Sequence, residues 1–327
     1  MRQQQRPRRN RKNQAIRDLV AETQLNMSQI IYPVFVCEGK NQESPIKTLV
    51  GQSRWSPDLL SKQIKHWKSL GLKHYALFPQ IAEEKKDKKA TEALNKNGLL
   101  PETLKRLKDD HPEVNLITDV ALDPYSSDGH DGLVENGEIL NDASVEILAQ
   151  MAVQQAHWGA DWVAPSDMMD GRVGAIRKAL DQAGHTNTNI LAYTAKYASC
   201  FYGPFRDALM SAPKFGDKKT YQMDPRNAKE ALRETKLDIA EGADMVMVKP
   251  ALAYLDVITR IKSISSVPVA AYNVSGEYAM IKAAAQLGTL NEDRAILETM
   301  YAFRRAGADV ILTYFAPHIF KLLNSDN

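Results

Sequence analysis

The sequence has little cysteine, no long apolar run and almost no excess charge. Only Cys37 and Cys200 occur in 327 residues, too few for a disulfide scaffold, which indicates a reducing compartment. No apolar stretch approaches the roughly 20 residues of a membrane span, and the N-terminus lacks the apolar core of a signal peptide. Lys and Arg number 42 against 40 Asp and Glu, so the body carries no basic footprint for nucleic acid. We therefore expect neither a membrane nor a nucleic-acid partner.

Basic residues nevertheless gather at the N-terminus. Such a segment cannot bury a core, so residues 1–23 are predicted to form a contact arm, with a flexible tail as the alternative, and residues 24–327 a single domain. A nucleic-acid arm is the less favoured alternative. A basic, acid-poor start also resembles a transit peptide in its charge, but we expect the cytoplasm. Seven basic residues precede the first acidic one, Asp18: Arg2, Arg6, Arg8, Arg9, Arg11, Lys12 and Arg17.

An internal repeat gives the strongest indication of the fold. The tripeptide Gly-Ala-Asp at 159–161, 242–244 and 307–309 precedes a short apolar run each time, and a looser copy begins at Gly71. A glycine at this point permits the left-handed backbone that ends a helix, so each copy predicts a helix followed by a strand. A helix beginning after Ser56 is expected to bury Leu60, Ile64 and Trp67.

Eight strands are predicted in all. Eight buried strands separated by helices favour a (β/α)8 barrel (TIM barrel) over an open doubly wound sheet. No glycine-rich phosphate loop follows the first strand, which also argues against a dinucleotide-binding fold. The predicted strands cover residues 30–36, 74–78, 115–119, 162–165, 190–196, 245–248, 267–272 and 310–313.

Two lysines follow predicted strands, Lys196 after 190–195 and Lys249 after 245–248. Burial and a neighbouring cation both lower the pKa of a lysine, and a neutral amine is what Schiff-base formation requires. The alternative for either lysine alone is an ion-paired or snorkelling side chain. In a barrel the chemistry gathers at the C-terminal ends of the strands, although polar residues there can also be solvated rim. Six polar residues have this position: Asp119, Ser166, Lys196, Lys249, Ser275 and Tyr314.

Several longer motifs resemble the porphobilinogen synthase (5-aminolevulinate dehydratase) family, in family order over almost the whole chain. The resemblance implies an asymmetric condensation of two 5-aminolevulinate molecules, with one C–C bond and one C–N bond formed and two waters lost. This is an early step of tetrapyrrole (heme) biosynthesis. It also implies a homo-octamer in which the arms wrap neighbouring barrels. The motifs are RKN (11–13), DVALDPY (119–125), AYTAKYAS (192–199), FYGPFRDA (201–208), YQMDP (221–225), MVMVKP (245–250), YNVSGEYAM (272–280) and ILTYF (311–315).

The same resemblance implies individual roles. Lys249 corresponds to the lysine that binds the first substrate as a Schiff base, and Lys196 to the lysine that binds the second. Residues 203–222 have the composition of a mobile lid, with an ordinary surface loop as the alternative. Phe201, Tyr202 and Phe205 are expected to pack, and Cys200 to be a small buried hydrophobe. The predicted carboxylate contacts are Ser275 and Tyr314 for the first substrate, and Arg206, Lys218 and Gln222 for the second.

Metal use departs from part of the family. The zinc-dependent branch has cysteines at the positions of Ala121, Asp123 and Asp131, so no catalytic zinc is expected. The two aspartates fit either an ion or water site, with a monovalent cation or Mg2+, or an Asp- and Gly-rich turn. Glu234, on a predicted helix over 227–241, matches the residue that anchors an allosteric Mg2+ through waters. Without the resemblance it would be read as an exposed helix glutamate.

Two other classes of function remain as alternatives. Another class I Schiff-base aldolase or lyase on a TIM barrel would need only one of the two lysines. A non-catalytic binding or assembly protein would depend on the basic arm and would not need Lys196, Lys249, Ser275 and Tyr314 together.

Overall fold

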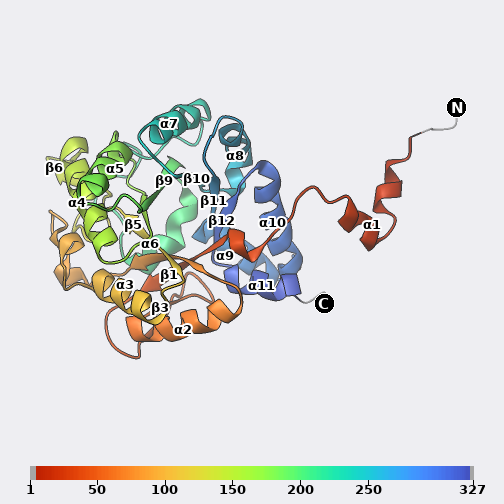
Figure 1. Cartoon of the computed structure of the whole chain (residues 1–327), viewed down its shortest axis with the longest axis horizontal. Helices are drawn as coiled ribbons and strands as arrows, with labels where there is room; N and C mark the ends of the chain where they lie inside the picture. The colour runs from red at the N-terminus through yellow and green to blue at the C-terminus, as the bar shows by residue number, and fades with distance from the viewer. Residues whose placement is uncertain (1–4, 325–327) are drawn as a thin grey trace.

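Eight parallel strands close into a barrel in the computed structural model, which describes residues 5–324 (Figure 1). The first and last strands pair through Ile30 with Ile311 and Ile31 with Leu312, which completes the ring. The predicted (β/α)8 barrel is therefore confirmed. Its strands are β1 (Ile30–Val36), β4 (His74–Pro79), β5 (Asn115–Val120), β8 (Trp162–Pro165), β9 (Asn189–Lys196), β10 (Met245–Lys249), β11 (Val269–Asn273) and β12 (Val310–Thr313).

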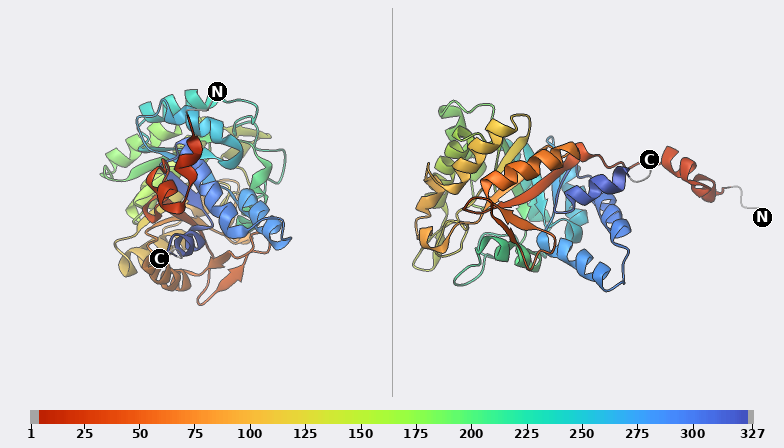
Figure 2. Two further views of the ribbon diagram at one scale, coloured as in Figure 1. Left: turned by 90° about the vertical axis from the view of Figure 1, so that its right-hand side faces the viewer. Right: turned by 90° about the horizontal axis from the view of Figure 1, so that it is seen from below.

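Helices surround the barrel (Figures 1 and 2). The helix α2 buries Leu60, Ile64 and Trp67 as predicted, and the Trp67 ring forms a T-shaped contact with Tyr32 of β1 at a centroid distance of 4.8 Å. The helices are α2 (Pro57–Ser69), α3 (Leu99–Asp110), α4 (Asn141–His157), α5 (Arg172–Gln182), α6 (Gly203–Leu209), α7 (Lys229–Ala240), α8 (Leu255–Lys262), α9 (Ser275–Gln286), α10 (Glu292–Ala306) and α11 (Ala316–Asn324).

The glycine and the aspartate of the repeated Gly-Ala-Asp each have a structural role. Gly307 has φ +114°, and a Cβ there would lie 2.8 Å from Cγ of Lys262, so only glycine fits. The aspartates accept a hydrogen bond from the first residues of the preceding barrel strand. Asp161 accepts from Leu116 N at 2.7 Å, and Asp309 accepts from Val269 N at 2.8 Å. The repeat therefore ends each helix and fixes the neighbouring strand at the bottom of the barrel.

Some elements differ from those predicted. The short pairs β2 (Glu43–Pro45) with β3 (Ser53–Trp55), and β6 (Leu133–Glu135) with β7 (Glu138–Leu140), were not expected. The helix expected over 227–241 spans only Lys229–Ala240. The prediction that Cys200 is buried was wrong: it is exposed. Cys200 begins a short 3-10 turn that directs Tyr202 inward in its place, and the Tyr202 hydroxyl donates to Tyr197 O at 2.7 Å.

The N-terminal segment extends away from the barrel (Figure 2). Its 3-10 turn Pro7–Arg11 and its helix α1 (Gln14–Leu19) have no buried residue, and the Leu19 side chain is 84% exposed. The chain joins the barrel near Gln24, whose carbonyl accepts from Arg304 Nε at 3.3 Å. The first four residues of the predicted arm lie outside the described residues. An extended segment of this kind is compatible with the arm, whose partner contacts stay a prediction.

Candidate active site

The two lysines are neighbours at the C-terminal end of the barrel. Lys196 ends β9 and Lys249 ends β10, and the two residues pair in register. Both are about 5% exposed. Lys196 Nζ donates to Asp131 Oδ2 at 3.2 Å and to the carbonyl of Ser166. The parallel barrel thus brings together two amines that are 53 residues apart in the sequence.

Aromatic rings surround the amine of Lys249. Desolvation by this burial, followed by repulsion from Lys196, lowers the pKa of Lys249 to about 7. Its amine is therefore substantially neutral near physiological pH, as nucleophilic attack on a ketone requires. The distances from Nζ to the ring centroids are 5.1 Å for Tyr193, 5.1 Å for Tyr202, 4.9 Å for Phe205 and 4.8 Å for Tyr272.

A carboxyl group with an unusual pKa lies in the same cavity. Burial, followed by repulsion from Asp123, raises the pKa of Asp119 to about 7, although its hydrogen bond with Ser166 opposes the rise. Buried polar atoms normally have a partner, yet Asp119 Oδ1 and Gln222 Oε1 have none among the described residues. Both residues line the cavity. Unsatisfied groups at this position are typical of a site that a polar ligand completes.

The segment 203–222, expected to be a loop, begins with the helix α6, and Lys218 joins the part after this helix to the barrel. Its Nζ donates to Asp131 Oδ1 at 2.9 Å and to Asp123 Oδ2 at 3.3 Å. Burial lowers the pKa of Lys218, but the two carboxylates raise it more and the net shift is upward. For Asp131, burial raises the pKa, whereas the ammonium groups of Lys196 and Lys218 lower it below its ordinary value. The buried carboxylate of Asp131 therefore lies between the ammonium groups of Lys196 and Lys218, and these ion pairs hold the loop over the site.

The enclosed space is far too small for substrates in this arrangement. The cavity between Lys249 and the loop has a volume of about 20 Å3, which is room for roughly one water molecule. Phe78, Arg206 and Gln222 also line it. Any organic substrate therefore requires the loop to move outward before it can enter, so we refer to residues 211–221 as the lid.

Ser275 and Tyr314 lie one side chain away from this cavity. Ser275 Oγ accepts from Phe205 N at 3.0 Å, and Tyr314 Oη lies 3.2 Å from Tyr272 Oη in a hydrogen bond. Phe205 and Tyr272 both contribute rings to the surroundings of Lys249. The structure thus groups nine of the predicted site residues, the two lysines included, around one cavity. It leaves Ser275 and Tyr314 behind two of the rings, while Glu234 is elsewhere.

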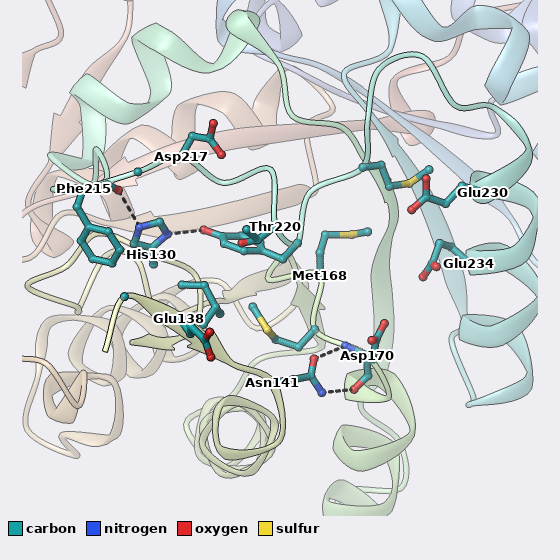
Figure 3. A pocket seen from close by; sticks show the side chains of 16 residues that line it. His130, Glu138, Asn141, Met168, Asp170, Phe215, Asp217, Thr220, Glu230 and Glu234 are labelled. Carbon is teal, nitrogen blue, oxygen red and sulfur yellow. Dashed lines mark hydrogen bonds between the residues drawn. The ribbon is translucent and has the colours of Figure 1, made fainter. Parts of the chain in front are cut away.

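Glu234 lies outside the barrel mouth, in a larger hollow of about 810 Å3. It stands with Glu230 on α7, across this hollow from His130 and Phe215 (Figure 3). Burial, followed by repulsion from Asp238, raises the pKa of Glu234. Within residues 5–324 no group of three or more His, Cys, Asp or Glu side chains could hold a metal ion. The residues that line the outer hollow are all different from those that line the lysine cavity, so the two sites are separate.

The sequence interpretation missed two features of the site. The first is the set of rings around Lys249: Tyr202 and Phe205 were expected only to pack, and Tyr193 and Tyr272 were not singled out. Tyr193 lies three residues before Lys196 on β9, so its place in a barrel strand was the available signal. The second is the contact of the lid with Asp123 and Asp131, which joins residues 95 and 87 positions apart and has no local signal.

The fold and the site together define a (β/α)8 barrel with two buried lysines at the C-terminal ends of neighbouring strands, the end where enzymes of this fold have their active sites. Comparison with known proteins narrows this class. The family model for delta-aminolevulinic acid dehydratase matches residues 4–322. The chain belongs to the delta-aminolevulinic acid dehydratase family.

Individual relatives agree with this assignment. The chain is 55% identical over 314 residues to the chloroplastic delta-aminolevulinic acid dehydratase of Physcomitrium patens, covering 95% of this chain and 72% of the relative. It is 52% identical to the Chlamydia pneumoniae enzyme, covering 98% and 96% of the two chains. A crystal structure of the Toxoplasma gondii enzyme in complex with its reaction product porphobilinogen is similar with a TM-score of 0.98 and 52% identity, over 100% of this chain and 93% of that one.

Proposed function

We propose that this protein condenses two molecules of 5-aminolevulinate to porphobilinogen with loss of two waters, through Schiff bases on Lys249 and Lys196. The observation that carries the proposal is the pair of buried lysines in register, one of them with a pKa of about 7. Membership of the family supports the overall reaction. A class I aldolase with a single lysine would leave the second buried amine without a use.

The first step uses the neutral amine of Lys249. It adds to the ketone of one substrate, and loss of water gives a protonated imine whose carbon is a better electrophile and whose neighbouring C–H is more acidic. Asp119, with a pKa of about 7, is suited to accept and return protons during these steps. Lys196 binds the ketone of the second substrate in the same way. Formation of the C–C and C–N bonds then returns both lysines as free amines.

Substrate carboxylates are assigned to the polar groups around the lysines. We propose that Ser275 and Tyr314 hold the first carboxylate and that Arg206, Lys218 and Gln222 hold the second. Lys218 is a point charge, so its grip on a carboxylate is less directional than that of an arginine fork. It already binds two carboxylates when the lid is closed. Exchange of one of these for a substrate carboxylate would couple binding to lid closure.

Two experiments test the function. Incubation with 5-aminolevulinate, followed by a colour test for the pyrrole, should detect product. Borohydride reduction in the presence of substrate should leave an adduct on the peptide containing Lys249, and Lys249→Ala should lose both adduct and activity. An Ala variant that traps as much adduct as the unaltered protein and retains turnover would refute the mechanism.

Cation binding is a separate proposal. Carboxylate oxygens suit Mg2+, and Glu234 lines the outer hollow without a cluster of further acidic ligands, within the part of the chain that the structure describes, that could bind the ion directly, so we propose an allosteric Mg2+ held there by Glu234 largely through waters. At Asp123 and Asp131 the ammonium group of Lys218 already forms an ion pair with both carboxylates. A monovalent cation at that position would therefore require Lys218 to withdraw. Ala121 offers no ligand, so we propose no catalytic zinc.

Assembly and location complete the proposal. We propose a homo-octamer in which the exposed segment before Gln24 docks on a neighbouring barrel, which would cover side chains such as Leu19. Within residues 5–324, no helix combines the length and apolarity that crossing a membrane requires. We propose a cytoplasmic location. The plant relatives are described as chloroplastic, so a plastid is the alternative that cell fractionation would distinguish.

A further inference from the structure

His130 connects the lid to the barrel on the outer side of the lysine site. Its side chain is only 2% exposed and bonds through both ring nitrogens. Nε2 lies 3.1 Å from the carbonyl oxygen of Phe215, and Nδ1 lies 3.1 Å from the hydroxyl of Tyr221. The imidazole also packs on the Phe215 ring at a centroid distance of 4.7 Å. Both partners belong to the lid, which Figure 3 shows around His130.

The partners determine the direction of each hydrogen bond. A carbonyl oxygen can only accept, so Nε2 must carry the proton that is donated to Phe215 O. Tyr221 Oη already accepts a bond from Asp131 N at 3.3 Å, and its own proton is free to be donated to Nδ1. Neutral His130 with its proton on Nε2 therefore satisfies all three hydrogen bonds in the series from Asp131 N through Tyr221 and His130 to Phe215 O.

This series of hydrogen bonds ends at Asp131, the residue that binds the amines of Lys196 and Lys218. The carboxylate of Asp131 accepts from Lys196 and from Lys218, and its backbone N–H donates to Tyr221. A neighbouring backbone hydrogen bond also holds the lid against the segment that contains His130: Lys214 N donates to Asp128 O at 3.0 Å. At Gly129 a Cβ would lie 2.4 Å from Ala212 O, so glycine is required for this close approach of the lid.

We propose that His130 is a positioning residue that latches the lid shut and fixes Asp131 against Lys196. It touches no reacting atom, and its effect passes through Tyr221 and Asp131. The kinetic part of this inference rests on the proposed function, whereas the latching of the lid does not. Loss of the latch should favour the open lid and weaken substrate binding more than it slows the chemical step.

Two matched substitutions separate the two bonds. His130→Asn can keep an acceptor near the Nδ1 position for Tyr221, and His130→Gln can keep a donor near the Nε2 position for Phe215. Lid opening is measured without substrate, as tryptic cleavage after Lys214 and Lys219, whose side chains are 57% and 76% exposed. Cleavage follows the population of the open state when reclosing is fast. His66→Gln, at an exposed histidine of α2, is the control.

Each single substitution should speed cleavage about fivefold, and His130→Ala about 25-fold, because a neutral hydrogen bond shifts a population by roughly a factor of five. KM for 5-aminolevulinate should rise by a similar factor, with a smaller change in kcat and with the Lys249 adduct retained. The Asn and Gln variants keep the test valid if the Ala variant does not fold. Cleavage at the rate of the unaltered protein in both would overturn the latch, and faster cleavage with unchanged KM would overturn the positioning role. Failure of the unaltered protein to make porphobilinogen would refute the proposed function while the cleavage result still decides on the latch.

Discussion

The low pKa of Lys249 makes adduct formation depend on pH in a way that can be calculated. A lysine with the ordinary pKa of about 10.4 is neutral in roughly one molecule in a thousand at pH 7.4. With a pKa of about 7, the amine of Lys249 is neutral in roughly 70% of molecules at that pH. The structure therefore raises the concentration of the reactive amine about 700-fold, which corresponds to about 4 kcal/mol.

The assay is the single-turnover rate of cyanoborohydride-trapped adduct on the Lys249 peptide between pH 5.5 and 9.5. The rate should rise with pH and level off above a midpoint near 7, because a depressed lysine pKa means that the amine loses its proton early. Lys196→Met should move the midpoint upward, since it removes the second-largest cause of the shift. It should stay below 10.4 because burial, the largest cause, is retained.

A charge-matched control uses Lys105→Met, an exposed position on α3, which should leave the midpoint unchanged. A midpoint above pH 9 in the unaltered protein would show that the amine is not desolvated as the structure has it. A midpoint that Lys196→Met does not raise would show that the two lysines do not interact.

Three further predictions follow from the site and the arm. Lys196→Met should abolish product formation while the Lys249 adduct still forms, as measured by the pyrrole colour test beside mass spectrometry; substantial turnover would contradict the two-lysine scheme. Zinc-selective chelation should leave the rate unchanged, whereas EDTA should lower it in the unaltered protein but not in Glu234→Gln; activity that tracks stoichiometric zinc would contradict this. Deletion of residues 1–13 should shift sedimentation toward smaller species and lower activity, although no lysine of the site is touched. A fully active assembly of unchanged size would show the arm to be passive.

The strands were predictable because burial in a closed barrel requires apolar residues that are consecutive in the sequence. A strand covered on both faces is a continuous apolar run, and Met245–Lys249 is buried throughout. The Gly-Ala-Asp repeat marks where such a strand begins. Its glycine ends the preceding helix, and its aspartate accepts a hydrogen bond from a backbone N–H of the neighbouring strand. The short pair β6 and β7 carries no such marker. It forms beside α4, where Leu133 N donates to Ser144 Oγ at 2.8 Å, a contact that depends on the finished fold.

The site was predictable only where a strand end fixes a residue. Lys196 and Lys249 follow apolar strands, so the parallel barrel brings them to one end whatever the loops do. Cys200 was misread because residues after a strand enter a turn whose inward positions depend on tertiary contacts. The same applies to Lys218: its distance from the strands gave no sign that it would be buried against Asp123 and Asp131.

The surroundings of the two lysines differ in a way that bears on the order of events. Lys196 donates to two oxygen atoms, one of them on Asp131, whereas Lys249 faces four rings. Attack by Lys196 on a ketone therefore requires it to give up an ion pair, and attack by Lys249 does not. This asymmetry favours Lys249 as the first lysine to react, because only Lys196 must first leave the carboxylate of Asp131.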